Sequence, residues 1–210
     1  MTDLVILAGG QARRMNGINK LLQTFDQQMQ LLKINQHFGG QVAQKLINSH
    51  RDQVLYQRLV PEIQCFQDDE TGFLGPLMGM KSAWQYVQHD YVLFVPCDVT
   101  YLPPYVLRTL HHTLARHPQA HVAYVEMNGD ALYPFCLMKR SALPVLQQHL
   151  SAQQFSLRKC FQQLHAQKQK FQHRSLIFHS INSFDELQQY QQMNLLSQPK
   201  YTLAQSTGEV

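Results

Sequence analysis

Two short, uninterrupted apolar runs stand out in the pattern of hydrophobic and polar positions, at residues 4–8 and 91–95. Continuous apolar runs of this length are typical of strands buried on both faces of a parallel sheet. Shorter runs predict two further strands, at 42–47 and 63–66. Apolar residues at helical spacing predict helices that separate the strands, over 29–38, 51–59, 77–88 and 103–116, the last opened by Pro103-Pro104. This alternation predicts a parallel α/β sheet with right-handed crossovers.

The second half of the chain departs from this alternation. Residues 122–127 and 131–138 flank Asn128-Gly129, a strong hairpin signal because both turn positions tolerate a positive φ. Further elements are predicted as helices at 141–150 and 155–167, a strand within 171–181, and a last helix at the capping box Ser183-Phe-Asp-Glu186. The predicted fold is a three-layer α/β/α arrangement around a mostly parallel sheet with one antiparallel strand. Residues 1–193 are expected to form a single domain and 194–210 a flexible C-terminal tail.

Composition favours a folded chain with a weakly charged surface. Of the 210 residues, 44% are hydrophobic and 15% charged, and about 30 glutamines supply much of the polar surface. The net charge of +4 is dispersed, with no basic run longer than Arg13-Arg14. Such a distribution disfavours nucleic-acid binding and suits a small phosphorylated ligand.

The apolar runs and the cysteines also predict the cellular compartment of the protein. No stretch reaches the roughly 18 apolar residues of a membrane span, so no membrane association is expected. The N-terminus lacks the positive region of a signal peptide. The four cysteines are scattered without a C-x-x-C pair, which is typical of buried thiols in a reducing compartment. We therefore expect a cytoplasmic protein.

A glycine pair and three cations follow the first predicted strand. The strand ends in Leu7-Ala8-Gly9-Gly10, and Arg13, Arg14 and Lys20 follow within ten residues. Backbone N–H groups, guanidinium forks and an ammonium group together make a candidate phosphate cradle. The spacing fits neither the dinucleotide fingerprint nor the P-loop. The simpler alternative is a strand–loop turn with solvated arginines.

Other polar residues follow the remaining predicted strands. Asp98 comes just after the second apolar run, so in a parallel sheet it shares an edge with the glycine pair. Opposite a triphosphate, its natural task is to hold Mg²⁺, which takes one or two carboxylates plus phosphate oxygens. Asn48 and Asp68 follow two other strands, and Gly75 and Gly79 flank the start of the next helix. Each residue alone also fits a cap, a turn or a helix start.

Taken together, these motifs resemble the molybdenum cofactor guanylyltransferases of the MobA type, within the nucleotidyltransferases that share a glycosyltransferase-like sheet. The resemblance spans about residues 4 to 190. It rests on motifs that occur in the family's order: Leu7-Ala-Gly-Gly10, Arg14-Met15, Lys20, Gly75-Pro-Leu-Met-Gly79, Pro96-Cys-Asp98 and Asn182 with Asp185-Glu-Leu187.

The resemblance implies a reaction and a set of site residues. GMP would pass from GTP to the terminal phosphate of the molybdopterin-bound cofactor, releasing pyrophosphate, with Mg²⁺ as the metal and Mn²⁺ as a substitute. The implied GTP-binding residues are Leu7, Ala8, Gly9, Gly10, Lys20, Asn48, Asp68 and Asp98. The implied catalytic residues are Arg14, Lys20 and Asp98, with Asp98 also on the metal. From position alone, in the second half of the sheet, the region around Tyr133-Pro134 and Asn182 is expected to bind the acceptor. The resemblance also leaves room for partner proteins that insert the cofactor, and for molybdoenzymes.

Several positions depart from the family pattern. Asn16 precedes Gly17, Asn19 stands where Asp is common before the lysine, and Leu21 occupies a place often held by Gly. Ser180 replaces the first asparagine of the usual Asn-x-Asn. Because Lys20 and Asp98 are retained, we interpret the departures as tuning of activity. The alternatives are a CTP-using or sugar-phosphate nucleotidyltransferase, or a non-catalytic GTP-binding relative.

Overall fold

The computed structural model describes residues 1–10, 17–72, 75–176 and 178–196 of the chain. These residues form a seven-stranded sheet in the order β5-β4-β1-β6-β8-β7-β9. The bounds of its strands are β1 Thr2–Leu7, β4 Gln44–Asn48, β5 Gln64–Phe66, β6 Tyr91–Pro96, β7 Val122–Met127, β8 Asp130–Lys139 and β9 Gln167–Phe171. Within this seven-stranded sheet, β8 runs antiparallel to both of its neighbours, and all other neighbouring strands are parallel. The predicted fold class is confirmed.

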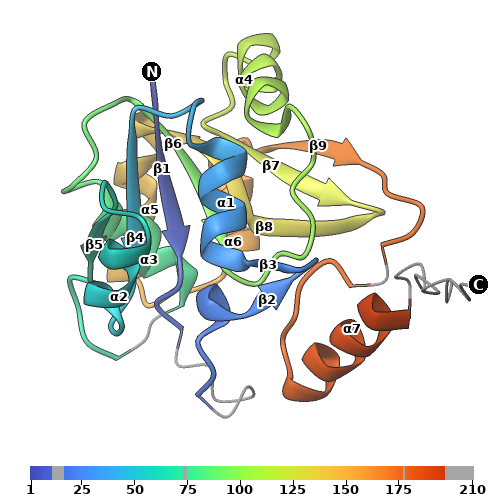
Figure 1. The fold of residues 1–210 in the computed structure, drawn as a ribbon. Coiled ribbons are helices and arrows are strands. Elements are labelled where there is room, and N and C mark those ends of the chain that lie inside the picture. Colours follow the sequence, from blue (N-terminus) through green and yellow to red (C-terminus); the bar gives the residue numbers. More distant parts are fainter. Residues whose placement is uncertain (11–16, 73–74, 177, 197–210) are drawn as a thin grey trace, which may run out of the picture.

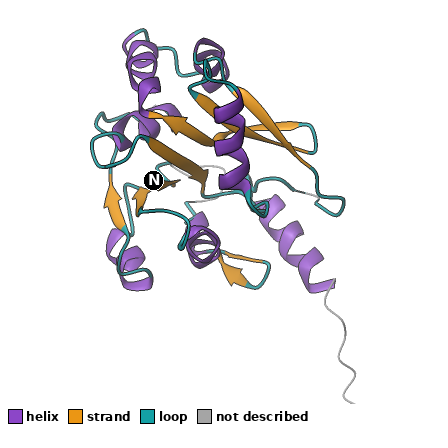
Figure 2. Ribbon diagram, turned by 90° about the horizontal axis from the view of Figure 1, so that it is seen from above, coloured by secondary structure: helices purple, strands orange, loops and turns teal. Residues whose placement is uncertain are grey.

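Helices cover both faces of the sheet, which gives three layers (Figures 1 and 2). Residues of α1, α2 and α4 join one buried apolar cluster, and those of α3, α5 and α6 join another. The helices are α1 Gln30–Phe38, α2 Gln53–Leu59, α3 Pro76–Ala83, α4 Val106–Arg116, α5 Leu143–Ser151, α6 Leu157–Gln163 and α7 Phe184–Leu196. Two short 3-10 helices, η2 Lys20–Leu22 and η3 Arg140–Ala142, complete the described helical structure.

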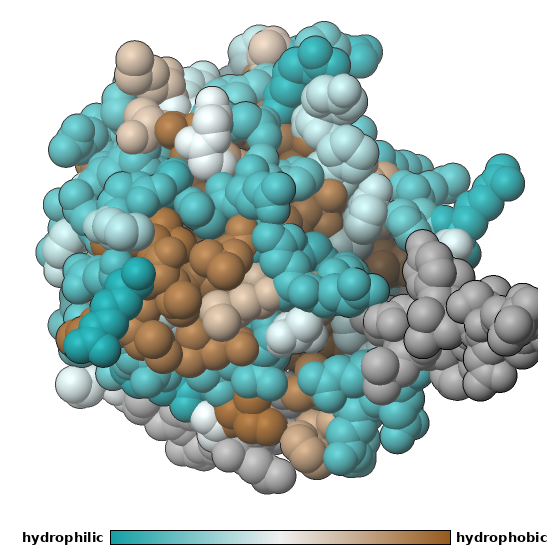
Figure 3. All heavy atoms as spheres, in the orientation of Figure 1, coloured by the Kyte–Doolittle hydropathy of each residue, from teal (hydrophilic) through white to brown (hydrophobic). Residues whose placement is uncertain are grey.

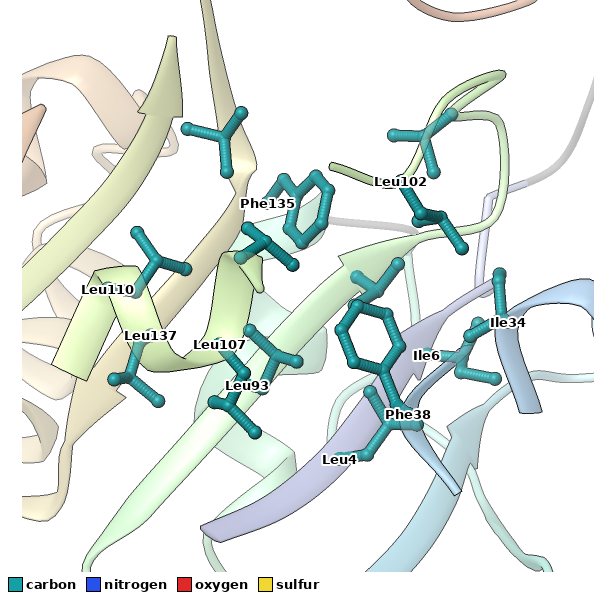
Figure 4. Close-up of a cluster of buried hydrophobic side chains, with 14 of the residues drawn as sticks. Leu4, Ile6, Ile34, Phe38, Leu93, Leu102, Leu107, Leu110, Phe135 and Leu137 are labelled. Carbon is teal, nitrogen blue, oxygen red and sulfur yellow. The ribbon is translucent and has the colours of Figure 1, made fainter. Parts of the chain in front are cut away.

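The first apolar cluster shows how the predicted apolar runs are used. Leu4 and Ile6 of β1 and Leu93 of β6 are fully buried. In Figure 4, Phe38 of α1 points toward Leu4 and Ile6, and Leu107 of α4 lies over Leu93. Full burial of such a side chain is worth about 1.5–3 kcal/mol relative to exposure, so this contact fixes both helices on the sheet.

The face of the molecule drawn in Figure 3 is mostly polar, as the composition suggests. In Figure 3, apolar residues gather left of centre on the face of Figure 1, and polar residues cover most of the remaining coloured area. No helix in the described ranges is long and apolar enough to cross a membrane.

Two predicted elements near the C-terminal end of the sheet were wrong. The helix expected at 155–167 ends at Gln163, and Gln167, its expected last residue, is instead the first residue of β9 (Gln167–Phe171). His165 adopts a positive φ of 49°, which stops the helix. Gln and Lys favour helices in isolation, but parallel pairing of β9 with β7 overrides that preference. The strand expected within 171–181 is reduced to an isolated bridge between Val99 and Ser180.

Two helices are shorter than the sequence predicts. Tyr105, at a φ of 59°, precedes α4, so Pro103-Pro104 lie before the helix and do not open it. The helix α3 ends at Ala83, five residues before the predicted end. Its first residue is Pro76, where a missing N–H costs nothing.

A small ribbon was not predicted at all. Strands β2 (Thr24–Phe25) and β3 (Gln28–Met29) pair across Asp26 and Gln27, which have φ values of 51° and 67°. The turn uses these conformations without a glycine, so the usual hairpin signal is missing.

The ribbon holds the last helix on the domain. Phe25 meets Tyr190 of α7 edge to face at 5.6 Å, and both belong to a small cluster with Ile181. Ser183 Oγ accepts the N–H of Glu186, as the predicted capping box requires. The helix α7 runs to Leu196, three residues beyond the predicted domain end. The remaining predicted tail, 197–210, lies outside the described residues.

Candidate active site

A cleft of about 800 Å³ opens where β1, β4 and β6 end. In parallel sheets, ligands bind at this edge. Among the described residues, all positions predicted to bind the nucleotide line this cleft, as do Pro134 and Asn182 of the predicted acceptor region, whereas Tyr133 does not. The nucleotide-binding positions are Leu7, Ala8, Gly9, Gly10, Lys20, Asn48, Asp68 and Asp98. The predicted Arg14 lies outside the described residues, as does the departure at Asn16.

Lys20 and Asp98 meet at this edge. Lys20 Nζ lies 3.4 Å from Asp98 Oδ2 and donates a hydrogen bond of 2.6 Å to the Ile181 carbonyl. The side chains are 14% and 22% exposed, so both are partly desolvated and still reach the cleft. A cation and a carboxylate in this position can bind a phosphate and a metal ion respectively.

Asn19 explains how Lys20 is presented. Its Oδ1 accepts the N–H of Leu21 and caps the 3-10 helix η2. Its Nδ2 donates to Asp52 Oδ2 at 2.6 Å and to the Tyr56 hydroxyl at 2.7 Å. The departure at Asn19 therefore links the lysine loop to α2, and the amide supplies both a donor and an acceptor for this task.

The segment that carries Asp98 is held from two sides. The Ile181 N–H donates to the Asp98 carbonyl at 3.0 Å, beside the bridge between Val99 and Ser180. From α1, Gln30 Nε2 donates to the Val99 carbonyl at 2.6 Å. Sequence reasoning missed Gln30. The signal in the sequence was a polar residue next to Leu31 at the start of the predicted helix. In the structure the Gln30 side chain is fully buried.

Two glycines make room for the Asn48 side chain. A Cβ on Gly9 would lie 2.6 Å from Asn48 Oδ1, and a Cβ on Gly79 would lie equally close. A Cβ on Gly10 would meet nothing within 4 Å. The lack of a side chain at Gly9 therefore leaves room for the Asn48 amide, and Gly79 lets helix α3 approach Asn48.

Asp68 is held by two donors, one from the last residue of β4 and one from the loop that follows it. Asn48 Nδ2 donates to Asp68 Oδ1 at 2.9 Å, and His50 Nε2 lies 3.1 Å from Asp68 Oδ2. The Asp68 side chain is 5% exposed, so its place at the cleft is tightly defined. Sequence reasoning missed His50 because only tertiary structure brings it to Asp68.

A second cation, Arg51, lines the cleft from the same loop. Its guanidinium donates to the carbonyls of Gly17 and Ile18. The loop between β1 and η2 is therefore tied to the loop after β4, close to Lys20.

Cys97 does not supply a nucleophile. Burial raises the pKa of its thiol to about 12, and the neighbouring Asp98 carboxylate adds to the rise. The reactive species of cysteine is the thiolate, which this environment disfavours.

The polar groups of the cleft fit a metal ion whose ligands come partly from the protein and partly from the substrate. The described residues contain no group of three or more His, Cys, Asp or Glu side chains able to hold a metal. Asp98 stands at the edge with part of its side chain exposed. Mg²⁺ is commonly held by one or two carboxylates together with phosphate oxygens, and a lone aspartate facing a phosphate site meets that requirement.

The cleft is also lined by Leu132, Pro134, Ser180 and Asn182. Asn182 is exposed, and its Nδ2 donates to Ser180 Oγ at 2.9 Å. Tyr133, expected here with Pro134, instead packs against Tyr124 and Phe161, because strand alternation turns it to the other face of the sheet.

Comparison with known proteins identifies the family. Residues 4–170 match the model described as the MobA-like NTP transferase domain. The chain belongs to the MobA-like NTP transferase family. A relative from Acinetobacter baumannii, named molybdenum cofactor guanylyltransferase, is 63% identical over 92% of this chain and 92% of its own length. A relative of the same name from Pasteurella multocida is 39% identical over 88% of this chain and 96% of its own.

Solved structures of this family and of other nucleotidyltransferases share the fold. Molybdopterin-guanine dinucleotide biosynthesis protein A from Archaeoglobus fulgidus aligns with a TM-score of 0.66 at 16% identity, over 91% of this chain and 97% of that chain. The CMP:2-keto-3-deoxy-manno-octonic acid synthetase complexed with CTP also gives 0.66, at 14% identity over 94% and 99%. At these identities the likeness concerns the fold alone.

Proposed function

We propose that this member of the MobA-like NTP transferase family transfers GMP from GTP to the molybdopterin-bound molybdenum cofactor. An oxygen of the acceptor's terminal phosphate forms a bond to the α-phosphorus of GTP. The bond from that phosphorus to the bridging oxygen breaks, and pyrophosphate leaves. The single observation that carries the proposal is the meeting of Lys20 and Asp98 in a cleft that also contains the glycine pair.

The names of the relatives support the choice of substrates. Two relatives that align with nearly the whole chain are named molybdenum cofactor guanylyltransferase. We place the acceptor at the part of the cleft lined by Leu132, Pro134 and the exposed Asn182. The partner proteins expected from the resemblance remain a prediction.

The protein's part in this reaction is electrostatic. The nucleophile is a phosphate that is already ionised, so no general base is required. An anion must approach a highly charged triphosphate, and Lys20 would offset that repulsion and stabilise charge on the departing pyrophosphate. Arg14 would add a second cation on the same chemical grounds. The backbone of Gly9 and Gly10 would bring N–H groups to the nucleotide.

Asp98 would hold Mg²⁺, which when bound offsets phosphate charge and can be replaced by Mn²⁺. Asp98 also accepts from Lys20 Nζ, so cation and carboxylate are positioned relative to each other before substrate arrives. We assign the reaction to the cytoplasm, because the four cysteines are unpaired and thiols stay reduced there.

The proposal is tested by pyrophosphate release with authentic acceptor, Mg²⁺ and one nucleotide at a time. We expect release with GTP and only background release with CTP, ATP or UTP. A preference for CTP would assign the chain to the cytidylyl-transferring branch. GTP binding without metal-dependent turnover would indicate a non-catalytic relative. Either result would overturn the proposed reaction.

A further inference from the structure

We propose that His50 is a positioning residue for the nucleotide: it holds the Asp68 carboxylate in the orientation that accepts hydrogen bonds from the nucleoside of GTP. The inference rests on the proposed function, because it assumes that the cleft binds GTP. It goes further by giving a role to a residue that the nucleotide-binding motifs do not contain.

Each of the two oxygens of Asp68 has its own partner. Oδ1 accepts from Asn48 Nδ2 at 2.9 Å, and Oδ2 lies 3.1 Å from His50 Nε2. Since a carboxylate only accepts hydrogen bonds, the His50 ring must carry its hydrogen on Nε2. Two donors on different oxygens prevent the carboxylate from rotating about its terminal bond.

The Asp68 carboxylate can still accept hydrogen bonds from a ligand. Asp68 lines the cleft, although its side chain is 5% exposed. Each oxygen retains a lone pair after accepting one bond, so Asp68 can still accept from a ligand. The triphosphate carries no donors at neutral pH. The donors of GTP are the N–H groups of the guanine edge and the hydroxyls of ribose, so Asp68 faces the nucleoside.

The setting of Asp68 differs from that of a structural His–Asp pair in the same protein. A comparable pair occurs at the opposite edge of the sheet, where His89 Nδ1 lies 2.8 Å from Asp3 Oδ1. Asp3 is fully buried and also accepts the N–H groups of Gln88 and His89, so its partners belong to the fold. Asp68 instead lies at a cleft, and its His50 partner keeps 28% of its side chain exposed.

The experiment compares GTP binding by calorimetry, without acceptor, for the parent protein and three variants. His50→Leu removes the donor, His50→Gln restores a side-chain N–H, and His89→Leu is the matched control away from the cleft. We expect His50→Leu to raise the Kd for GTP at least about fivefold, and the other two to stay within about twofold of the parent. In turnover, His50→Leu should raise KM and leave kcat nearly unchanged.

Nucleotide analogues then identify the donor that Asp68 binds. If it is the guanine edge, the penalty of His50→Leu shrinks with purine riboside triphosphate, which lacks both the exocyclic amino group and the N1 hydrogen. If it is ribose, the penalty shrinks with 2′,3′-dideoxy-GTP. An undiminished penalty with both analogues overturns the contact with the nucleoside.

The remaining outcomes are equally decisive. Equal GTP affinity of the parent and His50→Leu overturns the role of His50, as does equal weakening by His50→Leu and His89→Leu. Weakening by His50→Gln as large as by His50→Leu overturns the donor role. If His50→Leu fails to fold, the comparison of His50→Gln with His50→Ala replaces it. A parent protein that binds no GTP refutes the proposed function itself, which separates the two failures.

Discussion

Lys20 Nζ and Asp98 Oδ2 lie 3.4 Å apart, although 78 positions separate the two residues in the chain. The same ammonium group donates to the carbonyl of Ile181, near the C-terminal helix. Three distant segments thus converge on one cation. This convergence places a phosphate-binding charge beside a metal-binding charge and motivates the first two predictions.

Asp98→Asn should abolish guanylyl transfer without unfolding the protein. The change keeps the shape of the side chain and removes the charge that would hold Mg²⁺, so we expect at least about a hundredfold loss of turnover. Pyrophosphate release with GTP, Mg²⁺ and acceptor measures it. Asp90→Asn is the control, because the Asp90 side chain is 83% exposed in its ion pair with Arg140. Turnover by Asp98→Asn at the parent's rate would remove Asp98 from its assigned role.

Lys20→Ala should weaken GTP binding by at least about 1 kcal/mol, the scale of one charge-assisted hydrogen bond. The matched control is Lys45→Ala, because Lys45 pairs with Glu62, a residue outside the cleft, at 2.6 Å. Calorimetric titration with GTP measures both variants. An unchanged affinity in Lys20→Ala would contradict a phosphate contact.

Gly9→Ala and Gly10→Ala should differ in stability. The new Cβ at Gly9 would lie 2.6 Å from Asn48 Oδ1, whereas at Gly10 it meets nothing within 4 Å. We expect Gly9→Ala to lower the free energy of unfolding by about 1–3 kcal/mol and Gly10→Ala to change it little. Urea denaturation measures the difference. Equal stability of the two variants would show that Asn48 moves aside freely.

Gln30→Leu should slow transfer and leave GTP affinity unchanged. Gln30 Nε2 donates to the Val99 carbonyl, next to Asp98, so its loss frees the backbone that aims the carboxylate. We expect turnover to fall by about tenfold, since small misplacements of a catalytic group are costly. Gln36→Leu, an exposed position of the same helix, is the control. A fall in GTP affinity equal to the fall in turnover would point to a wider disturbance.

Cys97 should resist alkylation near neutral pH. With its pKa raised from 9.0 to about 12, the folded protein holds the proton more tightly than the unfolded chain does. The thiol's contribution to stability is therefore complete below about pH 9 and is lost as the pH rises toward 12. Iodoacetamide labelling of the native protein, followed by peptide mass analysis, should find Cys97 unmodified. Rapid labelling accompanied by loss of activity would contradict this.

Much of the architecture could be predicted from the chain alone. The apolar runs at 4–8 and 91–95 form the central strands β1 and β6, because a strand buried on both faces is apolar along its whole length. The Asn128-Gly129 turn placed the antiparallel strand β8 correctly. The polar strand β9 was missed because its stability comes from pairing with β7 and not from its own residues.

The sequence by itself determined which residues end the parallel strands, and therefore that Gly9, Asn48, Asp68 and Asp98 share one edge of the sheet. The helices predicted between successive strands make those strands parallel, so the residues that follow them meet at the same edge of the sheet. Only the tertiary structure decided which side chains hold them. Gln30 reaches Val99, and His50 reaches Asp68, through contacts between segments whose relative placement depends on packing of the whole core. Such contacts leave no pattern in the local sequence, because they form only when the distant segments have packed together.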